Sequence, residues 1–144
     1  MNKLFLILIC SFCISCNPYR VLECPIKNSK IIFIERKGAE MLKPSSTVKI
    51  VGENKEVYSP MKGVINFIDT VSTKLEISII TKNYIIVYQN LATTILRKGD
   101  NIKKGQYLGR VLDNDSLEVS VIKNGVPYMP DKVFKCPMEY VHEQ

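Results

Sequence analysis

Residues 74–91 read KLEISIITKNYIIVYQNL, and this stretch decides the fold class. Over 75–79 apolar side chains alternate with polar ones, which is the pattern of a β-strand with one buried face. A second β-rich run, 84–88, follows after Lys82-Asn83, a pair of residues that is typical of turns. The stretch therefore predicts two antiparallel strands joined by a tight turn.

Further β-rich apolar runs lie on both sides of this hairpin. Only one short segment, 37–42, is a candidate helix, and Pro44 ends it. No change of composition separates the runs, so they predict a single all-β domain, an antiparallel sandwich or roll. The expected flanking strands are 31–35, 47–51, 63–68, 106–112 and 116–122.

The composition bounds the chemistry. The 144 residues include 20 Lys and Arg against 14 Asp and Glu, which gives a formal net charge of +6. This length suits one domain with a core that needs no cofactor to fold. The basic excess favours anionic neighbours such as phospholipid or cell-wall polymers. His142 is the one histidine in the sequence, so chemistry that needs several imidazoles is excluded.

The N-terminus has the layout of an export signal. Lys3 precedes an apolar run, and Asn17 and Pro18 end that run too early for a membrane-spanning helix. An apolar and a small residue stand directly before Cys16, which resembles the processing site of bacterial lipoproteins. The resemblance implies cleavage before Cys16 and a lipid on its sulfur.

These signals predict a membrane-anchored protein of the bacterial cell envelope that faces the periplasm or the exterior. A soluble secreted form and an uncleaved signal anchor are the alternatives. Nucleic acid is not expected as a partner of an exported chain. The expected organisation is a signal peptide at 1–15, a lipid-anchored tether at 16–30, a β domain at 31–135 and a C-terminal tail at 136–144.

Two cysteines, Cys24 and Cys136, remain once the signal is removed and Cys16 carries its lipid. Exported proteins form disulfides, so the pair predicts one bridge between the two ends of the mature chain. Two free buried thiols are the alternative.

Five short motifs follow one another over residues 58–130. In this order and spacing they resemble the LytM or lysostaphin-type peptidoglycan endopeptidases, which are zinc enzymes with a duplicated hybrid-motif β-fold. The resemblance implies that fold for this chain. The motifs are YSPMKGVI at 58–65, VYQNL at 87–91, KGDNIKKGQYLG at 98–109, LEVSV at 117–121 and GVPYMP at 125–130.

Enzymes of that family hold zinc with two His and one Asp, and further His residues flank the bound water. The matched positions of this chain are Asn90, Ser116 and Glu118, none of which is His. The upstream His and Asp should precede Pro60, yet residues 31–59 contain neither. The sequence therefore predicts a pseudoenzyme that has lost the zinc site and uses no cofactor.

Two other groups of side chains offer metal ligands. Asp113, Asp115 and Glu118 carry carboxylates that calcium would accept, but Asx-rich segments between strands are usually simple turns. A lone histidine in a charged tail is ordinarily solvated. We therefore expect no metal at either place. The tail group consists of Glu139, His142 and Glu143.

A binding surface for an anionic polymer is a further prediction. Its candidates are basic residues around two Gly-containing turns and tyrosines at strand ends, where they could line a groove. Solvated turns and core packing are the alternatives. The predicted surface comprises Tyr58, Tyr88, Arg97, Lys98, Lys103 and Lys104, with Tyr84, Tyr107 and Arg110 beside them.

Three functions remain open. A zinc-free domain could bind peptidoglycan or a cell-wall hydrolase as a scaffold or regulator, a role that the resemblance implies because zinc-free members activate wall amidases. A hydrolase with a rearranged site at Ser116 and the nearby carboxylates would lack a general base beside its nucleophile. An exported domain with a purely structural role is the third. We expect the first.

Overall fold

The computed structural model describes residues 22–35 and 46–142. These ranges contain strands and one short 3-10 helix, η1 (Pro130–Lys132), but no α-helix. In the same ranges, no helix has the length and apolarity that a membrane span requires. The strands are β1 (Ser29–Glu35), β2 (Thr47–Gly52), β3 (Glu56–Tyr58), β4 (Gly63–Val71), β5 (Lys74–Ile80), β6 (Tyr84–Thr93), β7 (Asn101–Ile102), β8 (Tyr107–Val111), β9 (Leu117–Lys123), β10 (Val126–Tyr128) and β11 (Met138–His142).

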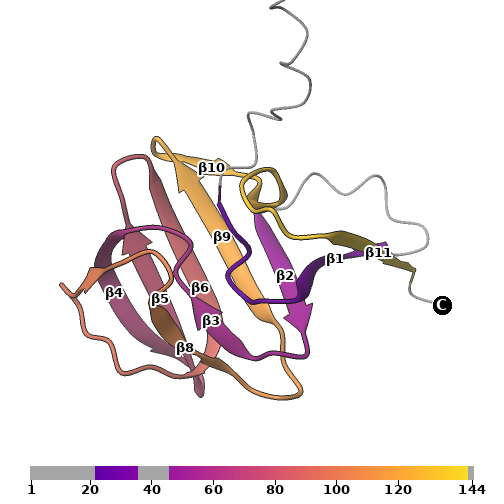
Figure 1. Cartoon of the computed structure of the whole chain (residues 1–144), viewed down its shortest axis with the longest axis horizontal. Coiled ribbons are helices and arrows are strands. Elements are labelled where there is room, and N and C mark those ends of the chain that lie inside the picture. The colour runs from indigo at the N-terminus through magenta and orange to yellow at the C-terminus, as the bar shows by residue number, and fades with distance from the viewer. Residues whose placement is uncertain (1–21, 36–45, 143–144) are drawn as a thin grey trace, which may run out of the picture.

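The strands form one mixed, mainly antiparallel sheet (Figure 1). Its main path runs β11-β1-β2-β9-β6-β5-β4-β7, and β10 pairs with β9. β3 pairs with β8, which also pairs with β6, and in Figure 1 these two strands lie in front of the main path. The all-β prediction is confirmed. The expectation of purely antiparallel pairing is corrected at one edge, where β11 runs parallel to β1.

The hairpin predicted over 74–91 is present as β5 and β6. Ile80 pairs with Ile85 across the turn, and the Thr81 hydroxyl accepts a hydrogen bond from the Tyr84 amide at 3.0 Å. The other expected strands are found with their ends shifted by a few residues. The candidate helix at 37–42 lies outside the described residues.

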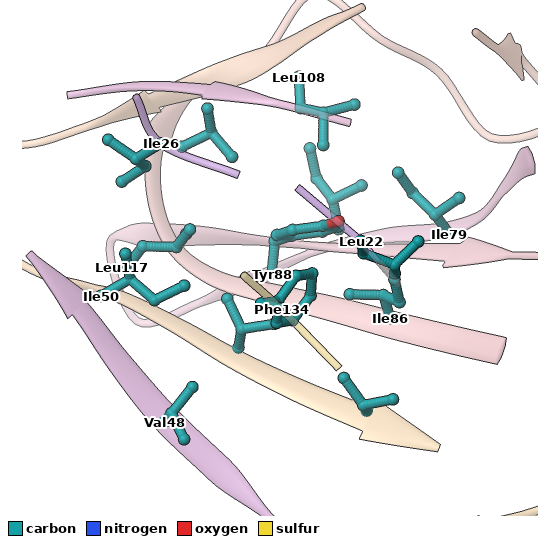
Figure 2. Packing of buried hydrophobic residues seen from close by; sticks show 14 of the residues in the cluster. Leu22, Ile26, Val48, Ile50, Ile79, Ile86, Tyr88, Leu108, Leu117 and Phe134 are labelled. Atoms are coloured by element: carbon teal, nitrogen blue, oxygen red, sulfur yellow. The ribbon is translucent and has the colours of Figure 1, made fainter. Parts of the chain in front are cut away.

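The core draws side chains from the N-terminal segment, from β2, β5, β6, β8 and β9, and from the segment after η1 (Figure 2). Tyr88 and Phe134 are its largest fully buried side chains, and aliphatic residues surround them. In β5, the consecutive residues Ile77, Ser78 and Ile79 are all buried. Successive side chains of a strand point to opposite faces, so the middle of β5 is covered on both of its faces.

The described segments near both ends of the chain pack against the domain. Leu22 is buried, its amide donates to the Val133 carbonyl at 3.1 Å, and its carbonyl accepts from the Lys135 amide at 2.8 Å. The described part of the expected tether at 16–30 therefore packs against the domain. The expected tail at 136–144 contains β11, which adds to the sheet beside β1. Backbone pairing rather than composition recruits both segments.

Cys24 and Cys136 are joined by a disulfide with an S–S distance of 2.05 Å. The structure thus has the bridge predicted from the sequence rather than two free thiols. Cys136 is buried, and the Cys24 sulfur also lies 3.1 Å from the Ser29 hydroxyl oxygen. The bridge fixes the N-terminal segment to the chain just before β11. Cys16 lies outside the described residues.

Candidate functional site

The three positions matched to the zinc site lie together in the fold. Asn90 is in β6, Glu118 is in the neighbouring β9, and Ser116 directly precedes β9. Gln89 pairs with Glu118 in the strand register, and the Asn90 side-chain amide donates to the Ser116 carbonyl at 3.2 Å. The sequence motifs therefore identified residues of one site.

An irregularity in β6 positions Asn90. The pairing register with β5 shifts between Leu75 and Ile77, so that Leu91 and Tyr88 are their partners and an extra residue bulges from β6. Asn90 has φ of 69°, a left-handed conformation that asparagine tolerates better than most residues. The bulge brings its amide within reach of the chain that leads into β9, where it forms a hydrogen bond rather than remaining free.

Glu118 faces a cation across the sheet. Lys49 of β2 is its direct cross-strand partner, and the Lys49 Nζ lies 3.8 Å from the Glu118 Oε1. Both side chains are partly exposed, so the pair contributes little to stability, on the order of 1 kcal/mol or less. Its consequence is electrostatic, because the carboxylate already has an ammonium group as its neighbour.

A second ion pair lies at the start of β5. Lys74 contacts Asp115, and Asp115 also accepts a hydrogen bond from the Ser116 amide at 2.9 Å. The hydrogen bond from Lys74 holds the pKa of Asp115 below its usual value, and the Ser116 amide and the charge of Lys49 act in the same direction. Asp115 therefore remains ionised at neutral pH, and two ammonium groups occupy the region around Asn90.

A pocket of about 200 Å³ opens between β5, β6 and β9 beside these residues. Gln89 donates to Glu76 across its wall at 2.6 Å. We call it the β6–β9 pocket. No motif of the sequence predicts a role at this place for Lys49, Lys74 or Glu76. The alternation in 75–79 places Glu76 on the strand face opposite to that of the apolar residues. The sequence does not predict which strands lie next to this one. The pocket is lined by Val71, Lys74, Leu75, Glu76, Gln89, Asn90 and Glu118.

The residues present do not fit a zinc ion. A catalytic zinc needs three good protein ligands, usually His with a carboxylate. Of Asn90, Ser116 and Glu118 only Glu118 is such a ligand, and it faces Lys49. Among the described residues, no group of three or more His, Cys, Asp or Glu side chains could hold a metal.

The side chains of the two other candidate metal groups do not converge on one point. Of the three carboxylates considered for calcium, Asp113 pairs with Arg110 at 2.9 Å, and the other two face the separate lysines described above. In the tail group, Glu139 pairs with Lys30, and His142 ends β11 at the sheet edge, separated from β9 by β1 and β2. Glu143 lies outside the described residues.

The predicted binding surface needs one clear correction. Tyr88 is 0 % exposed and its hydroxyl has no hydrogen-bond partner among the described residues, so it belongs to the core (Figure 2). Burial raises the pKa of this hydroxyl. Tyr88 lies two residues after buried Ile86 and therefore on the same face of β6, which is the signal that should have placed it inside.

The other members of that surface are at least partly exposed, but they are spread over strands β3, β6 and β8 and two turns. Tyr58 packs edge-on against Tyr107 with ring centroids 5.8 Å apart, and it donates a hydrogen bond to Glu56 at 2.6 Å. This hydrogen bond raises the pKa of Tyr58. The Lys123 ammonium lies over the ring of Tyr84, 5.8 Å from the ring centroid. The basic residues Arg97, Lys98, Lys103 and Lys104 are exposed in the turns around Gly99 and Gly105.

The chain thus combines an all-β sheet with Asn90, Ser116 and Glu118 held together at β6 and β9. Residues 43–130, more than half of the chain, match the model of Peptidase family M23. The chain belongs to Peptidase family M23, and the resemblance to LytM-type enzymes is confirmed. No curated protein matches the sequence.

Solved structures share the fold at low sequence identity. Csd3 from Helicobacter pylori is 22% identical with a TM-score of 0.65, covering 86% of this chain but 36% of its own. A chain of the SpoIIQ–SpoIIIAH pore-forming complex is 16% identical with a TM-score of 0.61, covering 82% of this chain and 94% of its own. A mutant catalytic domain of the prophage-encoded M23 protein EnpA from Enterococcus faecalis is 16% identical, with a TM-score of 0.55 and coverages of 72% and 88%.

Proposed function

We propose that this chain is a non-catalytic M23 domain of the bacterial cell envelope, anchored by a lipid on Cys16, that binds peptidoglycan or a cell-wall hydrolase as a scaffold or regulator. The observation that carries the proposal is the set of side chains in the former zinc site. Asn90 and Ser116 are poor zinc ligands, and the one suitable ligand, Glu118, has Lys49 at 3.8 Å.

The charges of the site support this proposal. A zinc ion would have to enter beside the ammonium groups of Lys49 and Lys74, which repel a second cation. The other carboxylate of the β6–β9 pocket, Glu76, accepts a hydrogen bond from Gln89. The pocket therefore offers no set of three good ligands that would hold a metal-bound water.

The presence of the β6–β9 pocket supports a binding role. The β6–β9 pocket still offers a mixed set of carboxylates, amides and an ammonium group to a polar ligand. The fold is compatible with assembly, because a chain in the SpoIIQ–SpoIIIAH pore-forming complex shares it. A peptide of the cell wall, with its own amides and charges, has the chemistry that such a lining recognises.

Zinc content and peptidoglycan cleavage test the catalytic half of the proposal. We expect lipidated protein purified from membranes and incubated with zinc to retain less than about one tenth of an equivalent after desalting, because three good ligands are missing. It should release no peptide from purified peptidoglycan. Stoichiometric zinc together with cleavage that a chelator abolishes would overturn the proposal.

Two assays test the proposed binding role. The first measures co-sedimentation of the protein with purified peptidoglycan, and the second measures the cleavage rate of isolated wall hydrolases in the presence of the protein. Glu118→Lys reverses a charge in the β6–β9 pocket and should abolish whichever activity the wild type shows. Glu53→Lys makes the same charge change at an exposed residue outside the pocket and should leave it intact. Wild-type protein that neither sediments nor alters hydrolase rates, or equal loss in both variants, contradicts the assigned role.

A further inference from the structure

A second and larger cavity is lined in part by residues of the 58–65 and 98–109 motifs. It is a groove of about 540 Å³ between the N-terminal segment, the chain that follows β3 and the turn before β8. We call it the N-terminal groove. Its lining consists of Glu23, Cys24, Pro25, Ile26, Lys27, Asn28, Ser29, Tyr58, Ser59, Pro60, Lys104, Gly105, Lys135 and Pro137.

The walls of the N-terminal groove are fixed by bonds between distant parts of the chain. The disulfide links two of its lining segments at Cys24 and Cys136. The Tyr58 amide donates to the Pro25 carbonyl at 2.8 Å, and the Gly105 amide donates to the Ser59 carbonyl at 2.7 Å. The groove is therefore preformed, and a ligand need not order its walls.

The charges in the groove select an anion. Three lysines line it against one acid, Glu23, which lies 3.3 Å from Lys135. Lys27 and Lys104 are exposed, and within the described ranges neither forms an ion pair. The Lys27 ammonium lies 5.5 Å from the ring centroid of Tyr58, whose own hydroxyl is occupied by Glu56. Two ammonium groups are thus available above a wall of proline and tyrosine.

The position of the groove in the chain selects the source of that anion. Glu23 is seven residues after Cys16, so a fully extended connection reaches at most about 25 Å from the lipid. A lipid on Cys16, as proposed above, would keep the groove within reach of the membrane surface, where anionic headgroups attract basic side chains that come within roughly 10 Å. A ligand elsewhere in the envelope has no such enforced proximity.

We propose that the N-terminal groove docks onto anionic phospholipid headgroups through Lys27, Lys104 and Lys135, and so fixes the orientation of the domain on its membrane. This inference rests on the lipid anchor of the proposed function. Headgroup phosphates bind the ammonium groups, and Pro137, the exposed proline of the lining, lies against the interface. The β6–β9 pocket is then presented in a constant direction rather than at random.

Lysine acylation on vesicles tests the docking. Full-length lipidated protein is reconstituted into vesicles of phosphatidylcholine alone or with added phosphatidylglycerol, and the acylation rate of each lysine is measured by mass spectrometry. Lys27 and Lys104 should react several-fold more slowly on the anionic vesicles, since each lysine at such a surface gains roughly fivefold in binding. High salt should restore their rates. Lys82 and Lys132, which are exposed outside the groove, should react equally on both.

A pair of matched variants separates docking from general charge. In Lys27→Glu/Lys104→Glu, the remaining groove lysine, Lys135, should lose its protection because the groove no longer docks. Lys82→Glu/Lys132→Glu makes the same change in net charge outside the groove and should leave Lys135 protected. Equal protection of Lys135 in both variants overturns the proposal.

The outcomes also distinguish this inference from the anchor itself. A lipid on Cys16 with no slowing of Lys27 refutes the docking and leaves the anchor standing. A wild-type chain that carries no lipid refutes the anchor, and slowing of Lys27 by anionic vesicles in that chain still supports the groove as a lipid site. Protection by soluble acidic wall fragments, with none by anionic vesicles, overturns the lipid assignment in favour of a wall ligand.

Discussion

Removing the disulfide should destabilise the domain strongly, and the structure gives the size of the effect. Cys24 and Cys136 are separated by 112 residues, so their bridge closes almost the whole domain into one loop. The chain-entropy relation gives about 5 kcal/mol for a loop of this length, and loss of native bridges usually removes ~2–5 kcal/mol. For a domain of this size the larger figure corresponds to a fall in Tm of roughly 15–20 °C.

The assay compares thermal and denaturant unfolding of oxidised wild type, reduced wild type and the Cys24→Ser/Cys136→Ser variant. The two forms without the bridge should agree with each other, and both should have a larger m value, because an unlinked unfolded chain exposes more surface. Amides of residues 22–29 should also exchange faster, since Leu22 and Ile26 would remain attached only by packing and backbone hydrogen bonds. A variant whose Tm lies within about 2 °C of wild type would refute the entropic reasoning.

Two further predictions concern Tyr88 and Cys16. Tyr88→Phe removes a buried hydroxyl that has no partner among the described residues, so it should raise the stability by about 1 kcal/mol. Burial raises the pKa of Tyr88, so above pH ~10 the unfolded state loses this proton before the folded state does, and the wild type becomes less stable. The difference in denaturant midpoint between the Tyr88→Phe variant and wild type should therefore grow above this pH. A difference that stays constant with pH would contradict the prediction. Cys16→Ser should leave the signal uncleaved and abolish the incorporation of labelled fatty acid into the protein. Continued incorporation of the label by this variant in cell fractions would count against Cys16 as the anchor.

The strands that could be predicted are those whose side chains carry a period. Residues 75–79 alternate, and their hairpin with 84–88 was found where the sequence placed it. The strands that were missed, β3, β7 and β10, have two or three residues each, too few to show any period. β11 was missed because its pairing with β1 depends on where the chain returns after η1, which is a property of the tertiary fold.

The site divides in a similar way. Asn90, Ser116 and Glu118 could be placed together because motif order reports on the whole fold. Lys49 could not be placed, since its position opposite Glu118 depends on the register between β2 and β9, and a shift of one residue would turn it to the other face. The N-terminal groove could not be predicted from the sequence for another reason. It is built by a disulfide and by single backbone hydrogen bonds between segments that have no periodic pattern.

The ion pairs beside Asn90 balance the carboxylates of this part of the sheet. Carboxylates that lie near one another without cations would repel one another. Here Lys49 stands opposite Glu118 and Lys74 contacts Asp115, so each carboxylate has a positive partner from the protein itself. The same arrangement opposes the binding of a metal cation. Replacing Glu118 alone by His would leave Lys49 in place and the upstream ligands absent, so recovery of zinc chemistry requires changes on β2 as well as on β9.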